Sequence, residues 1–197
     1  MKRLFDFIVT LTALVVIVPI LLVIGVLVVL DSKGPMIYKQ QRIGKNGKPF
    51  WLYKFRTMRH HSDKQGLLTV GDRDARITRI GYYLRKSKLD ELPQLWNVLT
   101  GDMSIVGPRP EVAKYVNMYN ERQRNVLNVK PGLTDPASLE YFEENKIIAS
   151  FDHPEEAYVN IVMPRKLELN LEYLERCNFF TDLFIMVRTL MRILMPR

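Results

Sequence analysis

The longest apolar run of the chain lies near its start. The 23 residues from Ile8 to Leu30 are interrupted only by two threonines, a proline and a glycine. As a straight helix this run spans roughly 35 Å, which is enough for a hydrocarbon core of about 30 Å. A cleavable signal peptide has a shorter apolar region that ends in small residues, whereas this run is followed by Asp31-Ser32-Lys33. The pattern therefore predicts a membrane segment that is retained.

Two features bear on whether this segment crosses the membrane. Pro19 lies in its middle and removes the hydrogen bond to the Val15 carbonyl, which favours a kink. Basic residues flank both ends, Lys2-Arg3 before the run and a basic block after it, and the positive-inside rule places basic flanks in the cytoplasm. A helix that bends at Pro19 and returns satisfies both flanks. Proline is also common in spanning helices, so both topologies stay open on the residues alone.

An alternating pattern follows from Met36 to Met58. Asn46-Gly47 separates two strand-like runs, and this dipeptide between such runs is a strong hairpin signal. In the second run Lys54 and Arg56 are two positions apart, so both cations are expected on the same face of the strand. They form either an ordinary solvated strand face or a pair of anion-binding groups.

The remaining pattern is mostly helical. Segments 74–86 and 163–177 carry apolar residues at helical spacing, and segment 111–128, of mixed polarity, is also predicted as a helix. Segment 60–73 is polar, contains two glycines and predicts a loop or lid. Segment 179–197 is apolar over most of its surface, with its arginines on one side. This pattern favours an interfacial amphipathic helix, although packing in a soluble core would produce it too.

These elements predict a mostly α fold with a small β element, associated with a membrane. Residues 1–32 form the predicted membrane segment, and residues 33–197 form one domain seated on the membrane. Cys177 is the only cysteine, which rules out a disulfide within the chain. The three histidines have no ligand spacing with one another or with the cysteine, so no zinc site is expected.

Charge is distributed unevenly along the chain. Lys and Arg total 29 against 21 Asp and Glu, which gives a net charge of +8. From Asp31 to His60 there are eight basic residues and one acid, Asp31 itself. A basic block beside an apolar segment is typical of a surface that binds anionic lipid, nucleotide or nucleic acid, or of a solvated face that keeps the protein soluble.

One acidic pair, Asp90 and Glu91, lies within a basic region. It precedes Pro93, after which apolar residues recur at helical spacing, and proline is favoured in a first helical turn. The free N–H groups of a helix N-terminus attract anions, and Arg85 and Arg109 flank the pair. This combination suits phosphoryl chemistry. The alternative is that Asp90 is a helix cap, a role that needs only one acid and leaves the Gly-Pro-Arg-Pro loop around Arg109 without a function.

The motifs resemble those of a known family. KLDELPQLWNVLTGDMSIVGPRPE, which contains the acidic pair, and YKFRTM, which contains Lys54 and Arg56, are similar to the signature of the bacterial sugar transferases, or monotopic phosphoglycosyl transferases. Members transfer a phosphosugar from a nucleotide sugar to polyprenol phosphate. The resemblance runs in order from Met1 to about Thr134 and more loosely to the C-terminus.

The resemblance implies a mechanism and its residues. Asp90 is expected to attack phosphorus and form an aspartyl phosphosugar intermediate, with Glu91 serving the proton or the metal. The implied cofactor is Mg²⁺, bound by Asp90 and Glu91, and the donor is a UDP sugar that releases UMP. The reaction would initiate assembly of a capsule, O-antigen, exopolysaccharide or glycoprotein glycan. The expected substrate-phosphate ligands are Lys54, Arg56, Arg85 and Arg109.

The resemblance also implies a location. It favours the re-entrant form of the N-terminal helix, on the bacterial inner membrane with the catalytic domain on the cytoplasmic face. Val18 stands where many members have serine before the proline, so a hydroxyl that could satisfy a freed carbonyl is missing. Segment 135–141 differs from the Gly-Trp-Ala-Gln-Val-Asn version found in many members, which leaves the identity of the sugar open.

A second class of function competes with the enzyme. A membrane-anchored adaptor could use the basic block to bind anionic lipid or nucleic acid. That hypothesis accounts for the charge and the anchor but not for an acidic pair inside a basic site. The chain also lacks an aromatic-and-basic motif of the RNA-binding type, so no nucleic-acid partner is expected. The resemblance implies a nucleotide sugar, polyprenol phosphate and membrane lipid as partners.

Overall fold

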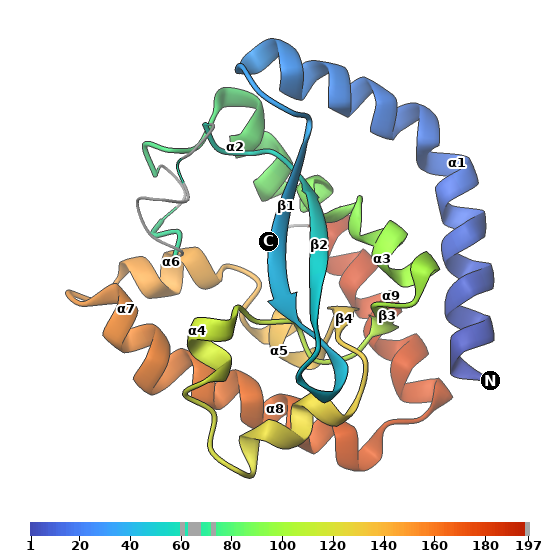
Figure 1. Cartoon of the computed structure of the whole chain (residues 1–197), viewed down its shortest axis with the longest axis vertical. Helices are drawn as coiled ribbons and strands as arrows, with labels where there is room; N and C mark the ends of the chain where they lie inside the picture. Colours follow the sequence, from blue (N-terminus) through green and yellow to red (C-terminus); the bar gives the residue numbers. More distant parts are fainter. Residues whose placement is uncertain (60–61, 63–67, 72–73, 196–197) are drawn as a thin grey trace.

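The computed structural model describes residues 1–59, 62, 68–71 and 74–195. The loop or lid predicted at 60–73 therefore lies largely outside the described residues. The fold is mostly helical with two small sheets, which confirms the predicted class (Figure 1). The elements in chain order are α1 (Lys2–Asp31), β1 (Ile37–Ile43), η1 (Lys45–Gly47), β2 (Pro49–Phe55), α2 (Arg79–Lys86), η3 (Leu89–Glu91), α3 (Gln94–Thr100), β3 (Ser104–Val106), α4 (Ala113–Val116), η4 (Gln123–Asn128), β4 (Gly132–Thr134), α5 (Pro136–Glu140), α6 (Glu144–Ala149), α7 (Pro154–Ala157), the π-helix η5 (Tyr158–Val162), α8 (Met163–Arg176) and α9 (Phe179–Leu194).

Helix α1 is the predicted membrane segment. It is continuous through Pro19, and Figure 1 shows its axis changing direction between its two halves. By length and composition it is the one helix in the described chain that could cross a membrane. A narrow stripe that includes Thr10, Ile24 and Val28 is buried, whereas most of its other apolar side chains are exposed. An apolar surface of this extent indicates contact with something other than water.

Polar contacts attach the first turns of α1 to the rest of the protein. Arg3 donates through Nη2 to the Leu99 carbonyl at 2.7 Å, and its Nη1 donates to the Val98 carbonyl. Asp6, buried in spite of its charge, accepts a 2.8 Å hydrogen bond from the Ser104 hydroxyl. The N-terminal end of α1 is therefore fixed against α3 and β3.

The other end of α1 is attached to the same body. Arg56, just beyond β2, donates to the carbonyls of Val28 at 3.1 Å and Lys33 at 2.7 Å, and thereby satisfies backbone groups at a helix C-terminus. The Asp31 carboxylate accepts a 2.9 Å bond from the Ile80 N–H in α2. Both ends of this 30-residue helix thus bind a single domain.

The predicted hairpin is confirmed. Strands β1 and β2 pair antiparallel from Ile37↔Phe55 to Ile43↔Pro49, and both turn residues, Asn46 and Gly47, have positive φ as the dipeptide predicts. The fully buried Asn97 of α3 holds strand β2, because its Nδ2 donates to the Trp51 carbonyl at 2.7 Å. The hairpin is thereby fixed to the helix that follows the acidic pair.

The helix predicted at 111–128 is wrong. The chain forms only the short α4 and the 3-10 helix η4 there. Between them the Asn120 side chain accepts from the Gln123 N–H at 2.9 Å, and the Gln123 side chain accepts from the Asn120 N–H at 3.0 Å. These local bonds compete with the helical ladder. Helix α2 likewise begins five residues later than predicted from 74–86, because the Thr78 hydroxyl caps it.

The other helical predictions agree with the structure. Helix α8 matches segment 163–177, and its Leu167 and Leu171 are buried in the largest cluster of apolar side chains. Helix α9 begins at a capping box formed by Asn178 and Thr181, and most of its large apolar side chains are exposed.

Two glycines allow the short parallel strands β3 and β4 to meet. A Cβ at Gly132 would lie 2.2 Å from the Gly107 nitrogen, closer than any side chain tolerates. We expect Gly132→Ala to destabilise the protein by about 1–3 kcal/mol and to lower its Tm in a thermal melt. Gly25→Ala is the matched control, since its nearest neighbour is the flexible Met36 side chain. Equal melting temperatures for both variants would contradict this packing.

Candidate active site

The candidate site is a cavity of about 1080 Å³ enclosed by the hairpin, α1, α2, α5 and α9. All the predicted site residues line it: Lys54, Arg56, Arg85, Asp90, Glu91 and Arg109. They come from four separate stretches of the chain, so the fold brings together what the sequence motifs keep apart.

The acidic pair lies in its own 3-10 turn, η3, immediately before α3. Lys88 enters this turn in the left-handed conformation, with φ of 57°. Neither η3 nor α3 has a side-chain cap, so Asp90 does not fill the capping role that was its structural alternative. The prediction that the pair precedes the Pro93 helix is correct, and its burial in the cavity points to a role in binding or chemistry.

Glu91 is held by two cations. Lys54 Nζ lies 3.0 Å from Glu91 Oε1, and Arg109 grips both carboxylate oxygens, with Nη1 3.1 Å from Oε2. Burial alone would raise the pKa of Glu91, but the charges of Arg109 and Lys54 hold it well below its usual range. The same ion pair raises the pKa of Arg109. These contacts favour the ionised form of Glu91, which orients both cations.

Asp90 has the opposite environment. It is 6% exposed, and no residue that the structure describes reaches its carboxylate with a hydrogen bond or ion pair. Burial, followed by the charge of Glu91, raises the pKa of Asp90, although Lys54 and Arg85 act against this shift. The two adjacent acids therefore differ: the Glu91 carboxylate is bound by two cations, whereas the Asp90 carboxylate is available to bind a ligand.

A residue that the sequence interpretation missed positions Arg109. The fully buried Asp135 accepts from the Arg109 backbone N–H at 2.9 Å, from the Ser138 N–H at 2.6 Å and from the Asn170 side chain at 2.8 Å. Its signal was present in the sequence as Asp135-Pro136, an N-cap followed by a first-turn proline. Asp135 joins the Gly-Pro-Arg-Pro loop to α5 and α8.

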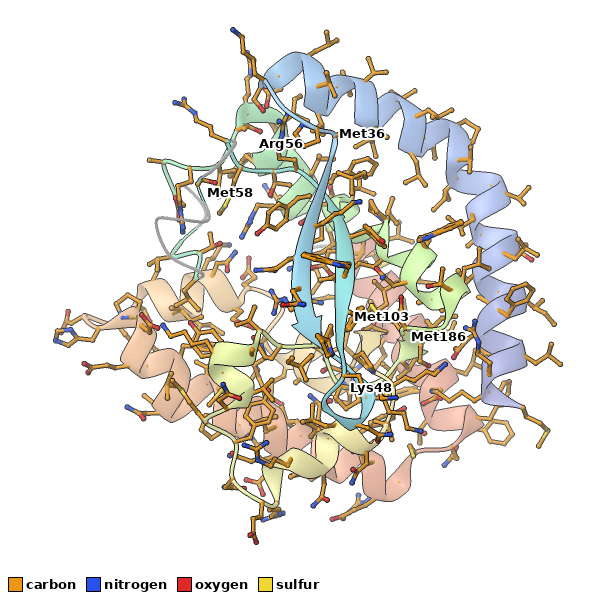
Figure 2. All side chains as sticks on the ribbon, viewed as in Figure 1. Met36, Lys48, Arg56, Met58, Met103 and Met186 are labelled. Carbon is orange, nitrogen blue, oxygen red and sulfur yellow. The ribbon has the colours of Figure 1, made fainter. Side chains whose placement is uncertain are left out.

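The other two predicted phosphate ligands lie differently. Arg85, in the last turn of α2, lines the cavity near Asp90. Arg56 also lines it, but its guanidinium is bonded to carbonyls at the end of α1 (Figure 2). Its position two residues after Lys54 gave no sign of this, because β2 ends at Phe55 and the strand alternation ends with it.

A second cluster of polar side chains, centred on Glu111, also lines the cavity. Glu111 accepts from Arg42, 3.2 Å away, and from the Tyr158 hydroxyl. Lys166 pairs with Glu144 at 2.6 Å. These side chains extend the charged wall that begins at Lys54 and Arg109, and the sequence gave no motif that contains them.

The described residues offer limited support for a metal. Within them there is no group of three or more His, Cys, Asp or Glu side chains able to hold an ion. Mg²⁺, however, is commonly held by one or two carboxylates together with substrate phosphates. The open carboxylate of Asp90 fits that requirement, whereas both oxygens of Glu91 are occupied.

Arg109 provides a prediction of its own. We expect Arg109→Lys to lower turnover by about 10²-fold. Lysine keeps the positive charge but cannot form bidentate hydrogen bonds with the Glu91 carboxylate or with a phosphate. A thermal melt should show that the variant still folds. The matched control is Arg122→Lys, whose guanidinium lies on the surface, 3.4 Å from Glu168. Unchanged kinetics for Arg109→Lys would remove Arg109 from the site.

The fold and the site together indicate a class of protein: a long apolar helix adjoins a cavity lined by lysines and arginines around two unlike carboxylates, an arrangement suited to phosphoryl transfer. The chain belongs to the bacterial sugar transferase family, whose model matches residues 1–196. This confirms the resemblance found in the sequence motifs.

Relatives with similar sequences match most of the chain. It is 38% identical over 197 residues to a UDP-glucose:undecaprenyl-phosphate glucose-1-phosphate transferase of Xanthomonas campestris pv. campestris, covering 98% of this chain but 38% of that protein. A putative undecaprenyl-phosphate N-acetylgalactosaminyl 1-phosphate transferase of Bacillus subtilis is 48% identical over 133 residues, covering 68% of this chain and 70% of the relative. The uncharacterized sugar transferase EpsL of Bacillus subtilis is 38% identical over 194 residues, 98% of this chain and 87% of its own length.

Proposed function

We propose that this protein transfers a sugar 1-phosphate from a UDP sugar to polyprenol phosphate, releases UMP and thereby initiates assembly of a bacterial glycoconjugate. Family membership and the names of the relatives support the reaction class. The observation that carries the proposal is the unlike acidic pair: an unpaired buried Asp90 beside a Glu91 that fixes Lys54 and Arg109. A lipid-binding adaptor has no use for such a pair.

The proposed chemistry has two displacements at one phosphorus. An Asp90 oxygen attacks the phosphorus that bears the sugar, the bond from that phosphorus to the UMP oxygen breaks, and UMP leaves with the electron pair. An oxygen of polyprenol phosphate then attacks the same phosphorus and releases the Asp90 carboxylate. Lys54 and Arg109 stabilise the charge that builds up on the phosphoryl oxygens. Asp90 would hold a Mg²⁺ ion, which would offset the negative charge of the donor diphosphate.

Glu91 has a supporting role in this proposal. A general base works best with a pKa near the operating pH, and the lowered pKa of Glu91 makes it a weak proton acceptor. Its contacts support the task of aiming Arg109 and Lys54 at the donor phosphates.

The activity is tested with detergent-solubilised full-length protein, a panel of UDP sugars and undecaprenyl phosphate. We expect one or a few of the sugars to release UMP and to yield a lipid-linked product. An adaptor would release none with any sugar. The contacts of the basic block also argue against the adaptor hypothesis. Its residues Arg42, Lys54 and Arg56 bind partners within the protein.

The same proposal includes a monotopic, re-entrant α1 on the cytoplasmic face of the inner membrane, with α9 lying in the interface. The contacts of Arg3 and Asp6 at one end and of Asp31 at the other support it, because one domain cannot hold both ends of a helix from opposite sides of a bilayer. The exposed apolar faces of α1 and α9 support burial in lipid.

Cysteine labelling tests this topology. Because Cys177 is exposed, single cysteines are placed at Lys2 and Lys33 in a Cys177→Ser background. Both should resist a membrane-impermeant thiol reagent in intact cells and react after lysis. Reaction of only one of them in intact cells would mean that α1 crosses the membrane. Pro19→Ala, which removes the break in the backbone ladder, should shift the labelling toward that outcome.

A further inference from the structure

Phe142 lies where three parts of the fold meet. It belongs to the loop between α5 and α6 and lines the cavity. Two cations lie close to its ring: Lys88 Nζ is 5.0 Å from the ring centroid, and the guanidinium carbon of Arg192 is 5.3 Å from it. Lys88 immediately precedes the acidic turn η3, and Arg192 lies in the last turn of α9. One aromatic ring therefore connects the acidic turn with α9.

The ring of Phe142 restrains both cations. Among the residues that the structure describes, neither Lys88 Nζ nor the Arg192 guanidinium has a hydrogen-bond or ion-pair partner. Both side chains are half-buried, and a cation–π contact is stronger there than on an open surface. Two like charges repel each other, so the contact with the ring is what keeps them together.

The backbone of Lys88 points to a use for its side chain. Its φ of 57° lies in the left-handed region, where glycine costs least and lysine is unfavourable. Backbone strain of this kind concentrates at functional sites. The charge of Lys88 also acts on both acids, because it helps to lower the pKa of Glu91 and opposes the raised pKa of Asp90. The lysine thus supplies a positive charge to the turn that carries the acidic pair.

We propose that Phe142 is a positioning residue for the transfer reaction: it holds Lys88 beside the acidic turn, and Arg192 of α9 holds the ring in place. The inference rests on the proposed function and adds to it a residue outside the family motifs. A cation fixed at this turn stabilises Asp90 as the carboxylate that attacks phosphorus. Its displacement should slow the first displacement step rather than weaken binding of the donor.

The test uses exchange of labelled UMP into the UDP sugar by the full-length protein. Phe142→Leu keeps an apolar side chain but removes the ring, and we expect it to lower the kcat of exchange about tenfold while the KM for the UDP sugar changes less than about twofold. Phe142→Tyr keeps the ring and should restore the wild-type rate. Phe151→Leu is the matched control, since this exposed phenylalanine follows α6 and does not line the cavity.

A second pair of variants covers the possibility that Phe142→Leu fails to fold. Lys88→Met keeps much of the side-chain length and removes the charge, so it should lower kcat to a similar extent, whereas Lys88→Arg can stack on the ring and should retain most of the rate. When Phe142→Leu folds, adding it to Lys88→Met should cause no further fall, because the ring acts through the lysine.

Three results would overturn the positioning role while leaving the transferase intact. They are losses that add in the double variant, a raised KM at unchanged kcat in Phe142→Leu, and a wild-type rate in Lys88→Met. Absence of exchange and of lipid-dependent turnover in the wild type would instead overturn the proposed function, and the role of Phe142 with it.

Discussion

Replacement Asp90→Asn is expected to abolish the exchange of labelled UMP into the UDP sugar, with a fall of at least roughly a thousandfold. The amide occupies the same volume but is a far poorer nucleophile than a carboxylate. The Asp90 carboxylate has no partner in the described part of the chain, so the substitution breaks no ion pair and the fold should persist. Exchange is measured without lipid, which confines the result to the first displacement.

The control for this variant is Asp102→Asn, the same change at an exposed position whose carboxylate accepts a hydrogen bond from the Thr100 hydroxyl. It should leave exchange unaltered. If Asp90→Asn exchanges at the wild-type rate, the covalent route through Asp90 is wrong. Exchange without lipid requires a covalent enzyme intermediate, so another side chain would then be the nucleophile, with the acidic pair as a metal site.

Glu91→Gln is expected to reduce both the exchange of labelled UMP and complete turnover by about 10²-fold. A neutral amide cannot hold Lys54 and Arg109 together, and these cations would separate from each other and from the donor phosphates. Glu168→Gln is the matched control, because its ion pair with Arg122 lies on the surface. Wild-type turnover in Glu91→Gln would show that Lys54 and Arg109 are positioned correctly without the Glu91 carboxylate.

The same variant has a pH signature. The pKa of Glu91 is lowered in the folded protein, so its ionised form contributes stability that is present above the unfolded pKa of about 4.3. That contribution is lost as the pH falls toward the lowered folded value. The difference in unfolding free energy between wild type and Glu91→Gln should therefore be largest near neutral pH and should shrink below about pH 4. A difference that does not change with pH would contradict the ion pair.

The sequence predicted well the features that depend on local chemistry. Asn46-Gly47 specifies a turn with positive φ, and Pro93 marks the start of α3, so the hairpin and the acidic turn were both recognised. The grouping of Asp90, Glu91 and Arg109 followed from the family motif, since no local rule places residues 18 positions apart in contact.

The features that failed depend on distant partners. Arg56 binds carbonyls 23 to 28 residues away, at the end of a helix whose path cannot be read from its own apolar pattern. Asp135 acts through the backbone of Arg109, 26 residues earlier, so its side chain looked like an ordinary cap. The polar cluster around Glu111 joins four helical or strand segments, β1, α6, η5 and α8, that share no periodicity, and only folding brings them together.

The measurement that tests the central claim most directly is the mass of the protein after brief mixing with the active UDP sugar in the absence of lipid. The account predicts a mass increase of one sugar phosphate in the wild type, located on the peptide that contains Asp90 and absent from Asp90→Asn. Added undecaprenyl phosphate should remove the label and yield the lipid product. Full lipid-dependent turnover without any adduct, and without UMP release before the lipid is added, would contradict it.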